Sequence, residues 1–93
     1  MRVIICNLNM FSNNQSIEVI DAKDGMVASQ SVGLNDLPRA VCALAGRYSV
    51  EEVKVIGMGD YGDAFADAIR EAHELNYGKN NNFNVEVVKC QSV

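Results

Sequence analysis

Apolar and alternating runs divide the chain into five predicted strands. The runs cover residues 3–6, 17–21, 26–32, 53–56 and 83–89. The first is apolar throughout and rich in branched residues, which predicts a central strand buried on both faces. In the last, Phe83, Val85 and Val87 alternate with polar residues, as in a strand with one wet face.

Two further segments carry the spacing of amphipathic helices. In residues 37–48 the apolar positions recur four, three and four residues apart, Asn35 or Asp36 can cap the start, and Pro38 falls in the first turn. Residues 63–75 predict a second helix, and Gly78 is expected to end it. The face of this second helix is predicted to carry Phe65, Ile69, Ala72 and Asn76.

The order β-β-β-α-β-α-β predicts how the strands pair. Asp24-Gly25 lies between two β-like runs and predicts a hairpin, so the first three strands should be antiparallel neighbours. Each helix then connects to a parallel strand. We expect a single α/β domain over residues 1–93, with a mixed five-stranded sheet in two or three layers.

Composition narrows the function classes. The chain has 93 residues, of which 48% are hydrophobic, and its formal net charge is -4. Its eight basic residues are scattered singly, which disfavours nucleic-acid binding. No apolar run has the length of a signal peptide or a membrane span, so we expect a cytoplasmic protein without membrane contact. Three cysteines without a C-x-x-C motif indicate neither a disulfide framework nor a zinc site.

The element order, from Arg2 to Lys89, resembles the core of the ribonuclease H-like superfold. That resemblance implies the strand order 3-2-1-4-5. Enzymes of this family carry an aspartate at the end of the first strand, where this chain reads Cys6-Asn7-Leu8-Asn9. A second acid of the family corresponds in region to Asp60, and the acid of a C-terminal helix has no counterpart. The resemblance therefore implies a core without nuclease activity, because two-metal chemistry needs several carboxylates.

The sequence Gly57-Met58-Gly59-Asp60-Tyr61-Gly62 stands between a predicted strand and a predicted helix. Its glycine spacing fits the dinucleotide fingerprint: Gly57 for a tight turn, Gly59 for approach of a pyrophosphate, Gly62 for packing of helix on strand. Three features oppose that interpretation. The motif follows the fourth strand, the next strand ends without a ribose-binding acid, and Asp60 and Asp63 place negative charge beside the phosphate position. The alternative is that the glycines only let the chain turn.

The carboxyl ends of parallel strands are where open α/β sheets bind ligands. We expect a polar crevice there that could hold a small molecule or a nucleotide. Its candidate ligand-binding residues are Asn7, Asn9, Gly57, Gly59, Asp60, Tyr61 and Gly62. We expect no catalytic residue, metal or cofactor.

Other reactive or exposed residues add little chemistry. His73, the only histidine, is interpreted as a packing residue beside the apolar stripe. Cys6 and Cys42 fall in predicted core, which leaves Cys90 as the plausible exposed thiol. Met10 and Phe11 interrupt a polar loop, where they either fold back onto the core or contact another chain.

The leading interpretation is a non-catalytic binding or assembly module that joins a protein partner, or a second copy of itself, through a sheet edge. That edge is either the last strand or the strand that follows Asp24-Gly25. The alternative is a nucleotide or phosphate-ligand binder that uses the turn at residues 57–62. A third possibility is a metal-dependent nuclease with an unusual acid set of Asp21, Asp60 and Asp63.

Overall fold

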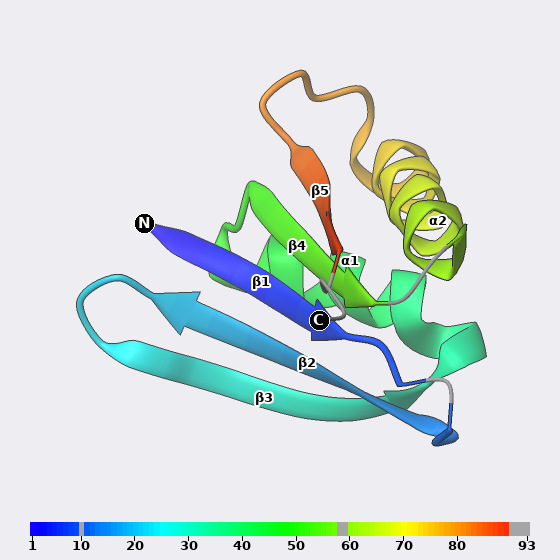
Figure 1. Cartoon of the computed structure of the whole chain (residues 1–93). Coiled ribbons are helices and arrows are strands. Elements are labelled where there is room, and N and C mark those ends of the chain that lie inside the picture. The colour runs from blue at the N-terminus through cyan, green and yellow to red at the C-terminus, as the bar shows by residue number, and fades with distance from the viewer. Residues whose placement is uncertain (10, 58–59, 90–93) are drawn as a thin grey trace.

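The computed structural model describes residues 1–9, 11–57 and 60–89 and shows a mixed five-stranded sheet with two helices (Figure 1). The strand order is β3-β2-β1-β4-β5, with β1 antiparallel to β2 and parallel to β4. This confirms the predicted fold class and strand order. The elements are β1 Arg2–Asn7, β2 Asn14–Asp21, β3 Gly25–Gly33, η1 Leu34–Asp36, α1 Leu37–Tyr48, β4 Glu52–Gly57, α2 Asp60–Tyr77 and β5 Asn84–Lys89.

The largest differences from the predicted boundaries are at the starts of β2 and α2. Strand β2 begins at Asn14 rather than at Ile17, because its first three residues, which are polar, pair with the end of β3. Helix α2 begins at Asp60 rather than at Asp63, so half of the glycine motif is helical. Both extensions consist of polar or small residues, which carry no hydrophobic periodicity.

The β2–β3 hairpin closes the amino-terminal end of β1, as Asp24-Gly25 predicts. Gly25 has a φ of 75°, which glycine adopts without strain. Asp21 accepts hydrogen bonds from the Lys23 amide at 2.8 Å and from Arg2 Nε at 3.0 Å. These bonds favour the carboxylate and lower the pKa of Asp21, the Lys23 amide contributing most.

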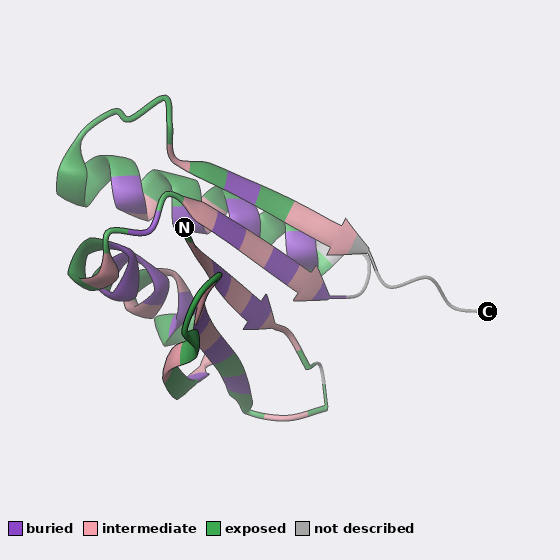
Figure 2. Cartoon of the chain, turned by 90° about the vertical axis from the view of Figure 1, so that its left-hand side faces the viewer, coloured by how far each residue is buried: buried purple, intermediate pink, exposed green. Residues whose placement is uncertain are grey.

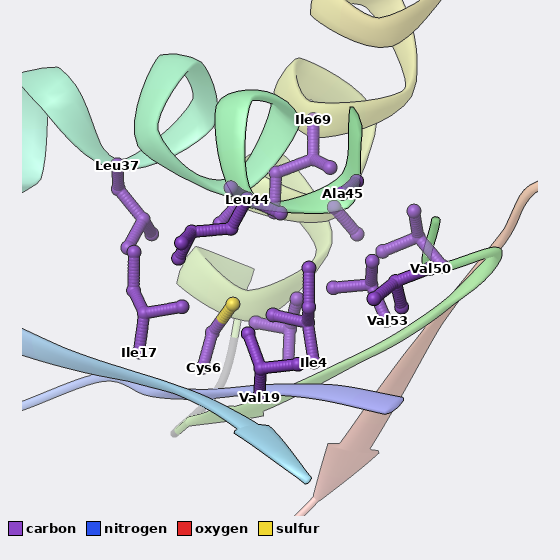
Figure 3. Packing of buried hydrophobic residues seen from close by; sticks show 14 of the residues in the cluster. Ile4, Cys6, Ile17, Val19, Leu37, Leu44, Ala45, Val50, Val53 and Ile69 are labelled. Carbon is purple, nitrogen blue, oxygen red and sulfur yellow. The ribbon is translucent and has the colours of Figure 1, made fainter. Parts of the chain in front are cut away.

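Both helices lie on the same side of the sheet, so the domain has two layers (Figure 2). Figure 3 shows Ile4 and Cys6 of β1 pointing toward Leu44 of α1 and Ile69 of α2, and these side chains are almost fully buried. The other side of β1 presents Val3 and Ile5, which are only half-buried. The expectation that this strand is buried on both faces is therefore wrong, because both helices of the described residues lie on its other face.

Helix α2 packs through a face slightly rotated from the predicted one. Ala66, Ile69 and His73 are buried, whereas Asn76 is exposed and its side chain donates to the Ala72 carbonyl. Gly78 ends the helix as predicted, with a φ of 79° and its amide bonded to the Glu74 carbonyl at 2.8 Å. Within the described residues neither helix combines the length and hydropathy needed to cross a membrane.

Candidate functional site

A small pocket lies where β1 and β4 end and α2 begins. It has a volume of about 100 Å³ and is lined by Leu8, Asn9, Leu34, Tyr61 and Phe65. Four of these five side chains are apolar or aromatic. An enclosed cavity of about 150 Å³ is enough for a benzene molecule. The pocket has about two-thirds of that volume, so it is sized for one side chain or part of one small ring, not for a whole nucleotide.

The structure brings together only part of the predicted ligand-binding set. Asn9 and Tyr61, which are far apart in sequence, meet in the wall of this pocket. Asn7 points to the opposite face of the sheet, because the preceding residue, Cys6, is in the core and side chains alternate along a strand. Gly59 and the side chain of Asp60 lie outside the described residues. The described wall is thus more apolar than the polar crevice we expected.

Gly57 and Gly62 have packing roles in this structure. A Cβ on Gly57 would lie 3.0 Å from the Leu8 Cβ, and one on Gly62 would lie 2.9 Å from a methyl of Val87. Neither glycine has a positive φ. The close approach of neighbouring chain segments is therefore the reason for glycine at both positions, and no ligand is required to explain them.

Gln15 holds the loop that forms one wall of the pocket. Its side chain is 1% exposed. Its amide nitrogen donates to the carbonyls of Asn9 and Ser12, at 3.1 and 2.9 Å, and its amide oxygen accepts from the Asn9 backbone amide. Sequence reasoning missed this residue, because a glutamine among asparagines and serines is typical of a solvated loop. The strand alternation that Gln15 shares with Ile17 and Val19 is the signal that could have found it.

The same loop carries an exposed aromatic ring, that of Phe11. Phe11 is 93% exposed, and its backbone amide donates to Asn9 Oδ1 at 3.0 Å. It does not fold back onto the core, which was one of two expectations for it. Met10, for which the same two alternatives were predicted, lies outside the described residues.

The two cysteines and the histidine among the described residues do not line the pocket. Burial raises the pKa of the Cys6 thiol to about 12 and also raises the pKa of the Cys42 thiol. His73 stacks on Phe83, with ring centroids 3.6 Å apart, and its burial lowers its pKa. His73 is thus a packing residue, as expected. Cys90 lies outside the described residues.

The acids proposed for a nuclease site do not converge. Asp21 pairs in register with Arg2, at the start of β1, whereas Asp63 lies near the start of α2, beside the carboxyl ends of the parallel strands. The length of β1 separates these two ends of the sheet. Among the described residues no group of three His, Cys, Asp or Glu side chains could hold a metal ion. The structure therefore does not support the proposed acid set.

The two edges of the sheet differ in how their backbone is protected. At the β5 edge, Arg70 donates from its guanidinium to the Val85 carbonyl at 2.6 Å and also pairs with Asp67 at 2.7 Å. A charged side chain thus covers part of this short strand. Glu86 adds a further charge to it. Charged residues on an edge strand are a common device against pairing with another chain.

The β3 edge lacks those devices. This strand has nine residues, Gly25–Gly33, with neither a charged residue nor a proline. Only its β2 side is paired, and the hydrogen bonds found among the described residues satisfy no backbone group on its outer side. Its single irregularity is a register shift beside Ile20 at one end. β3 is therefore a long and unprotected edge.

Comparison with known proteins gives a fold likeness only. No model of a known protein family matches the sequence, and no curated protein matches it. A crystal structure of Pelota from Archaeoglobus fulgidus, described as revealing inter-domain structural plasticity, is similar with a TM-score of 0.59 and 16% identity. The likeness covers 99% of this chain and 27% of that one. At this identity it shows the fold, and this chain spans about a quarter of the Pelota length.

Proposed function

We propose that this domain is a non-catalytic assembly module with a ribonuclease H-like core, and that β3 pairs with β3 of a second copy. The unprotected β3 edge is the observation that carries the proposal. Pairing of edge strands satisfies open N–H and C=O groups on both chains. The contrast with the β5 edge, which is partly covered by Arg70, favours β3 as the pairing strand.

An antiparallel β3–β3 pair satisfies two-fold symmetry, because each strand then makes the same contacts with its partner. The central residues Ser29, Gln30 and Ser31 are exposed and uncharged. Pairing therefore brings no like charges together, and the hydroxyl and amide groups can bond across the pair. The two sheets would join into one continuous sheet.

The site at the strand ends supports a non-catalytic role. An asparagine, Asn7, stands where the resemblance implies an aspartate, and the pocket at the same end of the sheet, on its other face, is mainly apolar. The likeness to Pelota, in which a comparable fold makes up part of a longer chain, is compatible with a domain that works by association.

Two positive charges on β3 test this proposal. We expect the wild-type protein to sediment as a dimer, at twice the monomer mass of 10.1 kDa. The double substitution Ser29→Lys with Gln30→Lys should give a monomer, because it places like charges at the centre of the pair. Analytical ultracentrifugation over a range of protein concentrations measures both states.

The matched control adds the same charges at a distant turn. Asn80→Lys with Asn81→Lys changes two exposed residues between α2 and β5 and should leave the dimer intact. A monomeric wild type at every concentration contradicts the proposal. A dimer that survives the β3 substitutions would place the interface elsewhere on the molecule.

The pocket favours a second candidate function, the binding of a small apolar group. Its walls offer the rings of Tyr61 and Phe65, with the side chain of Asn9 at the same site. This arrangement suits a single ring with one polar substituent. The nucleotide alternative has less support, because the pocket is small and the glycines beside it are accounted for by packing.

A thermal-shift screen separates these ligands. We expect phenol to raise the melting temperature and ATP or NAD⁺ to leave it unchanged. A ligand at 100 times its dissociation constant stabilises a protein by about 2.7 kcal/mol, which is several degrees for a domain of this size. Leu34→Phe should abolish the shift by filling the pocket. A shift with ATP or NAD⁺ would restore the nucleotide interpretation.

A further inference from the structure

The face of the sheet opposite the helices carries a set of apolar side chains that do not contribute to the core. Strand alternation places them there, since their neighbours in sequence are core residues. All but the exposed Met26 are half-buried. The set consists of Met26, Ile20, Val3, Ile5, Ile56 and Val88, and we call it the open-face band.

The register shows that this band is diagonal. Ile20 pairs with Val3 at one end of β1, Ile5 lies two residues further along β1, and Ile56 pairs with Val88 at the other end of the parallel strands. From Ile20 to Val88 the band crosses three strand spacings and four residues along the strands. This is a distance of roughly 20 Å. An α-helix covers that length with about 13 residues.

Carboxylates flank the band on both sides. Glu18 pairs with Ile5 across one border, and Glu86 and Glu52 lie on the other border, in register with Lys54 and Val3 respectively. The borders of the band therefore carry three negative charges and one positive charge, that of Lys54. Such a surface repels a second copy of itself and attracts a cationic partner.

We infer that the open-face band binds an amphipathic helix of a partner protein, with basic residues on both sides of its apolar stripe. Parallel strands such as β1, β4 and β5 are normally covered by helices on both faces, and here α1 and α2 cover only one. A helix of about four turns matches the band in length, in its narrow apolar stripe and in the sign of its flanks. Apart from Met26, the band lies on strands other than β3, and the inference does not depend on the proposed dimer.

Two synthetic peptides of about 18 residues test the inference. Both carry the same leucine stripe, and lysines flank it in one peptide and glutamates in the other. In fluorescence anisotropy with the purified full chain we expect the lysine peptide to bind and the glutamate peptide not to bind. Ile5→Ser should weaken binding by removing the centre of the band.

Charge variants distinguish binding of the lysine peptide to this face from non-specific attraction of the peptide to an acidic protein. The triple variant Glu18→Gln, Glu52→Gln and Glu86→Gln should weaken lysine-peptide binding about tenfold, because each exposed ion pair is worth roughly two- to threefold in affinity. Its matched control changes the exposed acids of α2, by Asp63→Asn, Glu71→Gln and Glu74→Gln. Both variants lose the same charge, and the control should retain wild-type affinity.

Several outcomes would overturn the inference. Equal weakening by the two triple variants would show a non-specific electrostatic attraction, and equal binding of the two peptides would remove the role of charge. Absence of peptide binding, with a dimer that the open-face triple variant makes tighter, would identify a second copy as the occupant. If Ile5→Ser fails to fold, the charge variants alone decide, since they leave the apolar band unchanged.

Discussion

Gly57→Ala should lower the free energy of unfolding by about 2 kcal/mol, within the range for overpacked interiors. The added methyl would lie 3.0 Å from the Leu8 Cβ and 3.0 Å from its Cδ1. The Leu8 Cβ is attached to the backbone, so relief requires movement of the chain that lines the pocket. Urea unfolding followed by circular dichroism measures the change.

Gly33→Ala is the matched control for that substitution. Its methyl would meet only the Asn13 carbonyl oxygen, at 3.8 Å, which is an ordinary contact. We expect it to change stability by less than about 0.5 kcal/mol, as for most surface substitutions. Equal effects at Gly57 and Gly33 would contradict a packing role for Gly57 and reopen its interpretation as part of a ligand site.

Gln15→Leu is expected to cost about 3 kcal/mol, and to loosen the loop that carries Asn9 and Phe11. The substitution keeps the approximate volume of the side chain but removes its three hydrogen bonds. It leaves the Asn9 N–H and the Ser12 carbonyl without protein partners, while the Asn9 carbonyl keeps the Ser12 amide at 3.3 Å. Each unsatisfied group costs about 1–3 kcal/mol where water cannot replace the bond. Denaturant unfolding measures the cost, and hydrogen exchange at the Asn9 amide measures the loosening.

Gln30→Leu is the control for this prediction, because the same change is made on an exposed residue of β3. It should be close to neutral for stability when both variants are compared as monomers, at a protein concentration too low for the proposed β3 pairing. If Gln15→Leu were as mild as Gln30→Leu, and exchange at Asn9 were unchanged, the loop would not depend on the buried amide. The pocket wall would then have another support.

The sequence was sufficient to predict the elements and their order along the chain. Runs such as Val3–Cys6, the Asp24-Gly25 turn and the helical spacing from Leu37 to Tyr48 each report a local preference. Local preferences, combined with the rule that helices connect parallel strands, leave few arrangements of five strands. The order β3-β2-β1-β4-β5 itself was expected from the resemblance to the ribonuclease H-like core, which is one of those arrangements.

Tertiary contacts alone decided the character of the site. Leu8 and Tyr61 are more than fifty residues apart, and their shared pocket exists because β1 and β4 end side by side. The glycines at 57 and 62 look like a phosphate loop in sequence, and only the positions of Leu8 and Val87 reveal steric reasons for them. Strand register and helix placement decide which side chains are in contact across a sheet. The pattern of residues along the sequence specifies neither of them.

The open-face band shows the same division between sequence and structure. Alternation along each strand predicts which residues share a face, and the sequence determined that much for Val3 and Ile5. That both helices cover the same face, and that Ile20, Ile5 and Val88 fall on one diagonal, follow from strand pairing between distant segments. The sequence by itself determined the elements and their order. The packing of those elements decided which side chains stay exposed and can bind a partner, because a side chain is exposed only where no other part of the fold covers it.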